Sequence, residues 1–501
     1  MKPLYLILLI LAAGCQLNNK TANNKQSIKV NINSEVEFQA IHNFGASDAW
    51  SCQFVGNWPE EQKNKIADLL FSLEEKEDGS PAGIGLSCWR FNIGGGSADQ
   101  AGDTKISDPW REAECFLQED ATYDWNKQKG QRWFLRAAKE RGVEDFIGFV
   151  NSPPVWLTKN KRANSDGGNS TNLLSENFDK YSRFLIDVTK NIKKNEGVLF
   201  DYLSPVNEPQ WDWKDGQEGS PWTNSEVAEI CKIIGNDLKK AGLSTKIEIS
   251  EAGQLNHFYE KANDVERGLQ VEDFFSPESE NYVGNVPNMA HKIAGHSYFT
   301  TTNDSVLNAV RSKVKNEINK VDPQLEFWMS EFCVLGNNDG FTGNGRDLGM
   351  ETALFVANVI HADLTIANAS AWHWWLAISP YDFKDGLVYI DKSETDGNFY
   401  ESKLLWTLGN YARFIRPGAR RIFVESTPNS NLKISAFKNS NNQIVVVCIN
   451  RGDAAENIQF KLSGEARVYE TSDKHNLTLT GKQNLDKAIQ VPGRSVTTFV
   501  R

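Results

Sequence analysis

The chain of 501 residues has few of the patterns that mark metal or nucleic-acid binding. Its seven cysteines form no Cys-x-x-Cys pair and have no histidine at the spacing of zinc ligands, so we predict no metal site. No organic cofactor is implied either. A net charge of −11 without any basic stripe argues against nucleic acid as a partner. The same charge suits a soluble surface and a neutral substrate.

The apolar run at the N-terminus, Leu4–Ala13, is too short to cross a membrane as a stable helix. A charged start followed by such a run is typical of a secretory signal, and Leu11–Cys15 resembles a bacterial lipobox. That resemblance implies cleavage before Cys15 and lipidation of its sulfur; the alternative is a plain secretory signal with a chance cysteine. We therefore expect a signal peptide over 1–14, a polar tether over 15–27 and an outer-membrane lipoprotein in the cell envelope. Its periplasmic or surface face stays open, as does any disulfide pairing.

Aromatic residues are abundant, with 15 Trp and 12 Tyr in an otherwise ordinary soluble composition. Flat aromatic faces stack on pyranose rings in sugar-binding clefts. Most aromatic side chains nevertheless serve core packing, and we expect that role for the majority here.

Short apolar runs alternate with helical patterns through most of the chain, which predicts a (β/α)₈ barrel over 41–415. The eight runs that we assign to strands are 43–47, 85–92, 145–152, 200–208, 246–252, 293–298, 325–331 and 369–375. Helical stripes occupy 60–71, 131–141, 175–193, 224–241 and 302–321. Loops over 92–130 and 152–176 follow strand ends, so they are expected to wall a substrate cleft.

The pattern changes after about residue 415 to short alternating runs with polar turns, which predicts a β-sandwich over 416–501. The early segment 28–40 begins with a similar alternation, Ile28–Ile32. One strand cannot form a sheet alone. We therefore predict that this N-terminal strand joins the C-terminal sandwich.

Two glutamates, Glu208 and Glu331, close the fourth and seventh predicted strands and are 123 residues apart in sequence. In a parallel barrel both would lie at the C-terminal mouth, where barrel enzymes keep their chemistry. A convergent pair of carboxyl groups is what hydrolysis of a glycosidic bond needs. The alternatives are a surface turn at Asn207–Pro209 and a buried structural role for Glu331. Such burial is costly without a partner, which favours catalysis.

Other residues at strand ends are candidates for substrate binding. Arg90 could keep Glu331 ionised, Tyr298 could donate a hydrogen bond to it, and His296 could bind substrate. A structural salt bridge and a satisfied core histidine are the alternatives for Arg90 and His296. For the remaining candidates packing is an equal alternative, and they are Asp48, Trp50, Trp156, Asn207, Trp211, Trp372 and Trp374.

Several of these motifs together resemble glycoside hydrolase family 30. They are Phe44–Ser47, Arg90–Gly95, Ser152–Trp156, Ser204–Gln210, His296–Tyr298 and Trp328–Phe332. The resemblance implies a barrel fused to a split β-sandwich and hydrolysis with retention of configuration. It implies that Glu331 is the nucleophile and that Glu208 is the acid/base.

Three segments, Trp50–Phe54, Asn207–Trp211 and Trp328–Cys333, most resemble the endo-β-1,6-galactanases of that family. The resemblance implies a polysaccharide partner, β-1,6-galactan side chains of arabinogalactan, for a protein that we expect to be a monomer. The alternatives are a β-1,6-glucanase, a xylanase or a non-catalytic glycan-binding lipoprotein. A xylanase that recognises glucuronic acid would need a cationic side chain near the eighth strand. Lys384 is the cationic residue close to that strand in the sequence.

Overall fold

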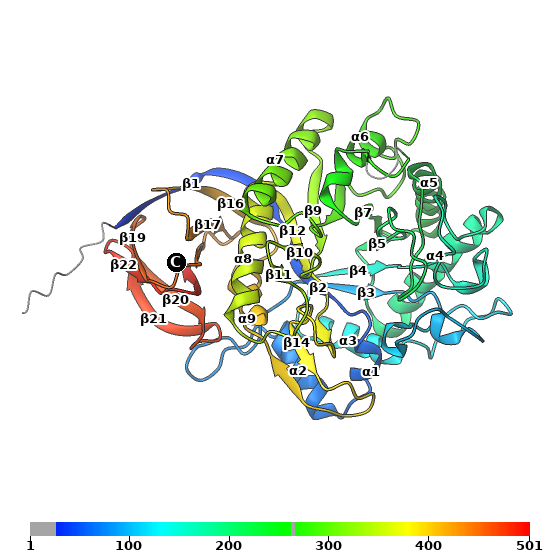
Figure 1. Ribbon diagram of the computed structural model, residues 1–501, viewed down its shortest axis with the longest axis horizontal. Coiled ribbons are helices and arrows are strands. Elements are labelled where there is room, and N and C mark those ends of the chain that lie inside the picture. Colours follow the sequence, from blue (N-terminus) through cyan, green and yellow to red (C-terminus); the bar gives the residue numbers. More distant parts are fainter. Residues whose placement is uncertain (1–26, 262–265) are drawn as a thin grey trace, which may run out of the picture.

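The structure is a computed structural model that describes residues 27–261 and 266–501. A barrel occupies one end of the molecule and a β-sandwich packs against its side (Figure 1). The predicted signal peptide, Cys15 and the tether up to residue 26 lie outside the described residues. Within the described ranges no helix is long and apolar enough to cross a membrane.

The barrel sheet is parallel, and its strand order β6-β5-β4-β3-β2-β12-β9-β8-β7 follows the chain around a ring. The fifth predicted strand is divided into β6 and β7, so this interrupted strand closes the ring between β5 and β8. Each of the eight predicted runs contains a strand, which confirms the barrel. The strands are β2 (Asn43–Ser47), β3 (Cys88–Asn92), β4 (Asp145–Phe149), β5 (Tyr202–Ser204), β6 (Lys246–Ile247), β7 (Ser250–Ala252), β8 (Lys292–His296), β9 (Glu326–Glu331) and β12 (Ala369–Trp374).

Helices surround the barrel sheet, and three of the longer ones, α5, α7 and α9, begin at a residue whose side chain accepts a hydrogen bond from a free N–H group of the first turn. Thr223 and Glu226, for example, form a capping box at the start of α5, which ends at Gly242 in a left-handed conformation. The longer helices are α2 (Glu60–Phe71), α3 (Lys129–Glu140), α4 (Phe178–Glu196), α5 (Asn224–Ala241), α7 (Asp304–Val321), α8 (Met350–Thr365) and α9 (Lys403–Ala412), and α1 (Cys52–Val55) and α6 (Gln270–Phe275) are short.

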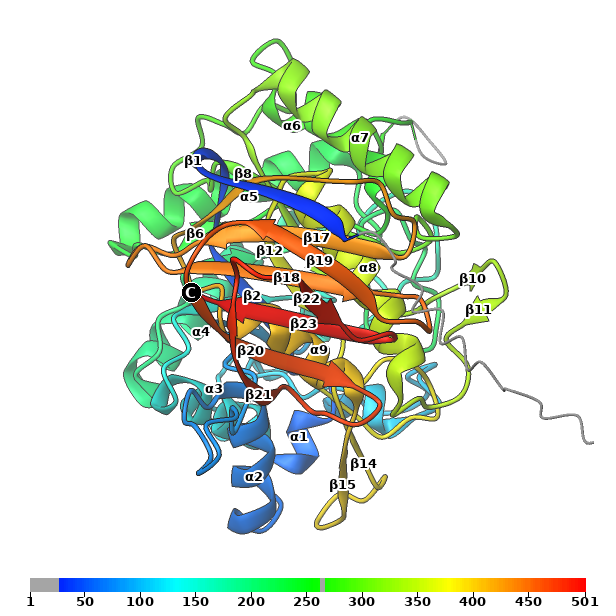
Figure 2. The same ribbon diagram turned by 90° about the vertical axis from the view of Figure 1, so that its left-hand side faces the viewer.

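The sandwich sheet has the order β21-β20-β23-β18-β17-β16-β1-β19-β22 (Figure 2). The N-terminal strand β1 (Ile28–Ile41) lies antiparallel to β16 and parallel to β19, which confirms that it joins the C-terminal module. The other strands are β16 (Ala419–Ser426), β17 (Leu432–Lys438), β18 (Ile444–Asn450), β19 (Glu456–Lys461), β20 (Glu465–Ser472), β21 (Thr478–Asn484), β22 (Ile489–Val491) and β23 (Ser495–Val500).

Two small sheets complete the fold near the barrel mouth. One pairs β10 (Asn337–Asn338) with β11 (Phe341–Thr342), and the other joins β13 (Ile378–Ser379), β14 (Val388–Ile390) and β15 (Phe399–Glu401). The cysteines of the described ranges form no disulfide. They are buried free thiols, namely Cys52, Cys88, Cys115, Cys231, Cys333 and Cys448.

Candidate active site

Glu208 and Glu331 meet at the C-terminal ends of the barrel strands. Glu331 is the last residue of β9, and Glu208 follows β5 by four residues. A carboxylate oxygen of each lies within 4.8 Å of the other and of a ring nitrogen of His296. Both glutamates are about 95% buried, yet they line a pocket of about 290 Å³. The sequence-predicted pair is therefore assembled in space.

Aromatic side chains form most of the remaining pocket wall. The lining residues besides the two glutamates are Asn207, Trp211, Trp213, Gln217, Tyr298, Phe299, Leu335 and Trp375. Trp211 and Phe299 approach edge to face at 6.1 Å, and Phe299 is 46% exposed, so a flat apolar surface is open to a ligand. Across this lining there is no lysine, arginine or histidine, so the pocket suits a neutral ring.

Arg90 and Tyr298 make the contacts with Glu331 that the sequence suggested. Arg90 Nη1 lies 2.9 Å from Glu331 Oε2, and the Tyr298 hydroxyl donates to Oε1 at 2.9 Å. Arg90 is fully buried, so its charge acts in a medium where water screens little. Each oxygen of the Glu331 carboxyl group thus has one partner that fixes its orientation.

His296 lies between two carboxylates and not in the pocket wall. Its Nδ1 is 2.8 Å from Glu208 Oε1, and its Nε2 is 2.9 Å from Glu251 Oε2. Burial alone would lower the pKa of His296, but the carboxylates of Glu331, Glu208 and Glu251 outweigh it and raise the pKa to about 10. His296 is fully buried, so its predicted contact with substrate is replaced by contact with the glutamates.

Burial raises the pKa of Glu208 above its ordinary value, and the neighbouring charges of Glu331 and Glu251 add to the rise. Hydrogen bonding to His296 acts in the opposite direction. A raised pKa keeps a carboxyl group protonated closer to neutral pH, which suits a proton donor.

Asn207 is held beside this pair by the amide of Asn151. Asn207 Nδ2 donates to Asn151 Oδ1 at 3.0 Å, whereas Asn207 Oδ1 is buried without a partner. Trp213 Nε1 donates to the carbonyl oxygen of Glu208 at 3.1 Å, which ties the aromatic wall to the glutamate. Asn207 and Trp211 thus line the pocket, as expected for substrate-binding residues.

The structure does not bring Asp48, Trp50 or Trp156 into the pocket wall. Asp48 is 1% exposed and accepts a hydrogen bond from the backbone N–H of Asn92, and burial raises its pKa to about 8. Trp50 is 3% exposed and supports Trp375 edge to face at 5.2 Å. Trp156 donates its Nε1 to the carbonyl of Leu117 and packs on the barrel core.

The prediction for Trp372 and Trp374 is corrected. Both side chains are fully buried, so neither surface is open to a glycan. Trp372 Nε1 donates to Asp363 Oδ2 at 2.9 Å, and Trp374 Nε1 donates to the carbonyl of Asp385 at 2.7 Å. Alternation along β12 turns these two away from the mouth, whereas Trp375, just past the strand, lines the pocket.

Two buried glutamates of the interrupted fifth strand were not among the predicted site residues. Glu251 lies beside the predicted pair, and Glu248 forms an ion pair with Lys292 deeper in the barrel. Both are 0% exposed. The available signal was their position inside an otherwise apolar strand, because a charge there needs a partner.

The ligand-type atoms of Glu208, His296 and Glu331 are close enough together to hold a cation. His296 Nδ1 and Glu208 Oε1 are, however, bonded to each other, and Glu331 is paired with Arg90 and Tyr298. The absence of a metal stays a prediction.

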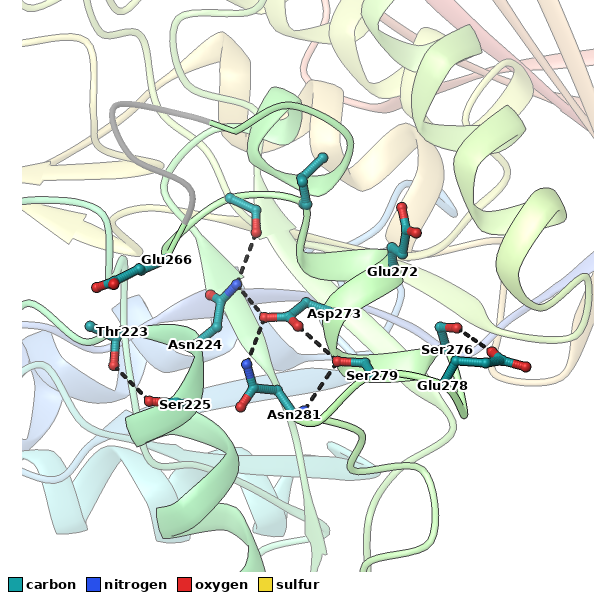
Figure 3. Close-up of a pocket in the computed structure, with 12 residues that line it drawn as sticks. Thr223, Asn224, Ser225, Glu266, Glu272, Asp273, Ser276, Glu278, Ser279 and Asn281 are labelled. Atoms are coloured by element: carbon teal, nitrogen blue, oxygen red, sulfur yellow. Dashed lines mark hydrogen bonds between the residues drawn. The ribbon is translucent and has the colours of Figure 1, made fainter.

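A larger pocket of about 570 Å³ lies between α5 and the loop after α6 (Figure 3). Its polar groups bond mainly to each other, as Asp273 does with Asn224, Ser279 and Asn281. This pocket shares no lining residue with that of Glu208 and Glu331.

A parallel eight-stranded barrel with two buried glutamates at the ends of its fourth and seventh strands defines a class, the barrel-type hydrolases of glycosidic bonds. Residues 25–389 match O-glycosyl hydrolase family 30, and residues 418–499 match the β-sandwich domain of the same family. The chain belongs to glycoside hydrolase family 30 and is an O-glycosyl hydrolase.

Three similar proteins illustrate the range of the family. An endo-β-1,6-galactanase of Hypocrea rufa is 23% identical over 437 residues, 84% of this chain and 80% of that protein. A glucuronoxylanase of Bacillus subtilis is 25% identical over 394 residues, 73% of this chain and 75% of that protein. The crystal structure of a conserved exported protein from Bacteroides fragilis has a TM-score of 0.88 at 33% identity, covering 94% of this chain and all of that one.

Proposed function

We propose that the protein is a retaining hydrolase in which Glu331 is the nucleophile and Glu208 is the acid/base. The observation that carries this proposal is the approach of their carboxylate oxygens to within 4.8 Å. Retaining enzymes hold the two carboxyl groups ~5–5.5 Å apart, whereas inverting enzymes need ~6.5–9.5 Å to admit a water molecule.

The proposed reaction proceeds in two displacements. Glu331 bonds to the anomeric carbon as the glycosidic C–O bond breaks, and the proton of Glu208 passes to the leaving oxygen. Glu208 then takes a proton from water, whose oxygen bonds to the anomeric carbon and releases Glu331.

We propose β-1,6-galactan as the substrate, cleaved in endo mode. The galactanase of Hypocrea rufa supports this choice because it aligns over most of both chains. The aromatic pocket wall without a cationic residue supports a neutral sugar at the point of cleavage. A β-1,6-glucan or a xylan is the alternative, and glucuronoxylanases lie at a similar identity.

The test of substrate is to incubate the protein with β-1,6-galactan, β-1,6-glucan, xylan and glucuronoxylan and to size the products. We expect rapid cleavage of the galactan to short oligosaccharides, with release of the β-anomer first. Preferential cleavage of another glycan would reject the galactan proposal and leave the two-glutamate mechanism untouched. Binding without cleavage of any of them would favour the glycan-binding alternative.

The role of Glu208 is tested by Glu208→Ala, which removes the proton donor. We expect kcat on the natural glycan to fall by roughly 10²–10⁴-fold, the usual worth of a general acid. An aryl glycoside with a good leaving group needs no acid, so its first displacement should survive, and added azide should restore turnover by attacking the glycosyl-enzyme. Failure of both rescues would contradict the acid/base role.

We further propose that the mature protein is a monomeric lipoprotein of the cell envelope, anchored through Cys15. The lipobox-like Leu11–Cys15 supports the anchor, and the exported relative from Bacteroides fragilis supports export.

A further inference from the structure

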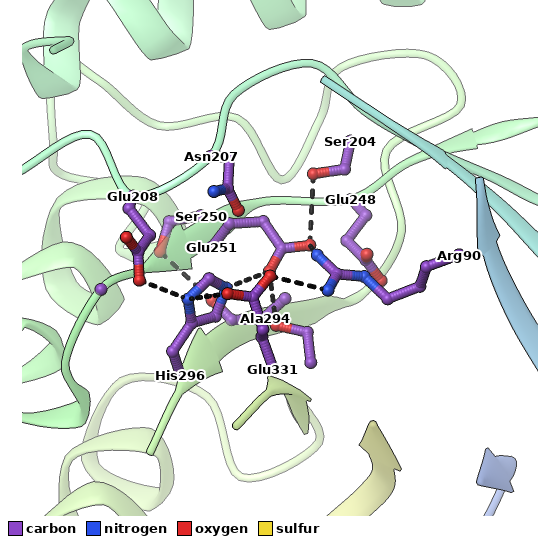
Figure 4. A network of polar contacts seen from close by, with 12 residues as sticks. Arg90, Ser204, Asn207, Glu208, Glu248, Ser250, Glu251, Ala294, His296 and Glu331 are labelled. Carbon is purple, nitrogen blue, oxygen red and sulfur yellow. Dashed lines mark hydrogen bonds and ion pairs between the residues drawn. The ribbon is translucent and has the colours of Figure 1, made fainter. Parts of the chain in front are cut away.

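Glu251 is a buried carboxylate at the barrel mouth that the proposed reaction does not use. It is fully buried, so it cannot contact a glycan. Four side chains from four other strands contact it (Figure 4). Oε1 has the Ser204 hydroxyl at 3.2 Å and Arg90 Nη2 at 3.5 Å, and Oε2 has His296 Nε2 at 2.9 Å and the Ser330 hydroxyl.

These four contacts define the charge of Glu251. Burial by itself would raise its pKa, but Arg90, His296 and Ser330 outweigh burial and lower the pKa far below the ordinary value. Glu251 is therefore an acceptor for hydrogen bonds on both oxygens, and His296 Nε2 must be the donor facing it.

A proton on Nε2 determines the role of the other ring nitrogen of His296, Nδ1, which faces Glu208. In the neutral form of His296 the single N–H belongs to Nε2, and in the imidazolium form, which its raised pKa favours, Nδ1 carries a second proton. His296 Nδ1, at 2.8 Å from Glu208 Oε1, is then free to accept the Glu208 proton or to hold it as an imidazolium. One proton is thus shared between Glu208 and Nδ1.

The backbone links Glu251 and Glu208 as well. The N–H of Glu208 donates to the carbonyl oxygen of Glu251 at 2.8 Å. Both residues have left-handed φ angles, 42° for Glu208 and 52° for Glu251, which non-glycine residues adopt at a cost unless their surroundings hold them. Glu251 therefore constrains both the main chain and the protonation of its neighbour.

We propose that Glu251 is a positioning residue that holds the Nε2 proton of His296 and thereby reserves one shared proton for Glu208. The inference rests on the proposed acid/base role of Glu208. During the first displacement the shared proton goes to the glycosidic oxygen, and during the second a proton from water returns to the same pair.

The other charged or titratable groups around His296 and Glu251 determine the direction of the effect. They are Arg90, Glu208, Glu248, Tyr298, Glu331 and His373. The positive charge of Arg90 balances only one of the two carboxylates Glu251 and Glu331. Negative charge therefore remains beside the shared proton. Because Glu251 raises the pKa of both Glu208 and His296, its neutralisation should release that proton at lower pH.

The test is the pH profile of kcat and kcat/KM for Glu251→Gln, measured on whichever glycan the wild type cleaves. We expect the basic limb to move down by about one pH unit, with kcat lower by about 10- to 100-fold and KM nearly unchanged; this loss is smaller than that for a missing general acid. An unshifted basic limb would overturn the proposal.

Glu196→Gln is the control, since Glu196 is also a buried and paired carboxylate but lies on α4, where it pairs with Arg132 outside this cluster. We expect it to lower the melting temperature without moving the basic limb. An equal shift in both variants would mean that the loss of any buried charge suffices, which would also overturn the proposal.

A measurement on the wild type keeps the test independent of whether Glu251→Gln folds. In protein labelled with ¹⁵N-histidine, the His296 signals, assigned by their loss in His296→Gln, should show a proton on Nε2 throughout the titration and a titrating Nδ1. The reverse tautomer would reject the proposal. Full activity of Glu208→Ala would instead reject the acid/base role of Glu208. If Glu208→Ala loses activity but the basic limb of the Glu251→Gln pH profile is unshifted, only the inference on Glu251 is rejected.

Discussion

At the scale of single residues, neighbouring carboxyl groups of one cluster have different surroundings. Burial raises the pKa of Glu208, whereas Arg90 and hydrogen-bond donors overcome burial at Glu251 and lower its pKa. Glu331 is paired with Arg90 and Tyr298. Environments that separate titratable groups in this way are how one site provides both a proton donor and an anion.

Replacing Glu331 with glutamine should remove the nucleophile with little change in shape. We expect hydrolysis to fall by roughly 10⁴-fold or more, because a residue that forms the covalent bond has no substitute in the site. Binding of the glycan should persist, since the aromatic lining is unaltered. Isothermal titration with the substrate and assays of released sugar measure the two effects, and near-normal turnover would exclude Glu331 as nucleophile.

Asp48 should make stability depend on pH. Its pKa is raised by burial from 3.8 to about 8, so the protonated form stabilises the fold fully below about 3.8, and this contribution is lost as pH rises through 8. Asp48→Asn stays neutral, so its melting temperature relative to wild type should rise between pH 5 and 8. The energy involved is at most about 1.4 kcal/mol per pH unit.

Thermal unfolding of both proteins across this range measures the effect. The exposed Asp396 gives the control Asp396→Asn, which should track the wild type at every pH. A constant difference between Asp48→Asn and wild type would show that Asp48 is ionised in the fold.

At the scale of elements, β1 shows how a segment gains its structure from distant partners. Its first residues pair with β16 on one side and β19 on the other, more than 380 residues away in sequence. Ile28, Val30 and Ile32 enter the sandwich core, and the polar residues between them face outward. The alternating pattern predicted this strand, whereas β21 has no such pattern because its residues are mostly exposed and polar.

Two valines on β1 provide a matched test of that packing. Val30 is 1% exposed, and Val36 is 41% exposed. Val30→Ala should lower the free energy of unfolding by about 1.5–3 kcal/mol, because it removes two buried methyl groups and leaves a cavity. Val36→Ala should change it by less than ~0.5 kcal/mol. Denaturant unfolding measures both, and equal losses would contradict the burial of the early part of β1.

Helix α8 could not be predicted from the spacing of apolar residues in the sequence. Twelve of its residues are buried, because it packs between the barrel strand β12 and the sandwich strands β17, β18 and β23. A helix covered on opposite sides has no single apolar stripe, so the helical period that revealed α2 and α5 is absent from its sequence.

At the scale of the whole molecule, the barrel and the sandwich form one body through α8, α9 and β1. Figure 1 shows β1 beginning at the sandwich end, opposite the barrel helices α4 and α5. An anchor at Cys15 would therefore attach the protein from its sandwich side.

Replacing Cys15 with alanine should free the protein from the membrane, because no other lipid-bearing cysteine is expected. We expect the wild type in the detergent-soluble membrane fraction and Cys15→Ala in the aqueous fraction, each with the same activity. The buried Cys448 supplies the control Cys448→Ala, which should remain with the membranes. An unchanged membrane fraction for Cys15→Ala would reject lipidation.

The sequence by itself determined the barrel, the sandwich, the shared N-terminal strand and the two glutamates at strand ends. Each of these follows from local periodicity or from position on one strand, and both can be read from residues adjacent in the sequence. Only the tertiary structure decided which side chains meet. It buried Trp372 and Trp374, exposed Trp375 to the pocket, turned His296 towards two carboxylates and placed Glu251 among four other strands. These outcomes depend on barrel closure and on contacts between residues far apart in the chain, which no local pattern contains.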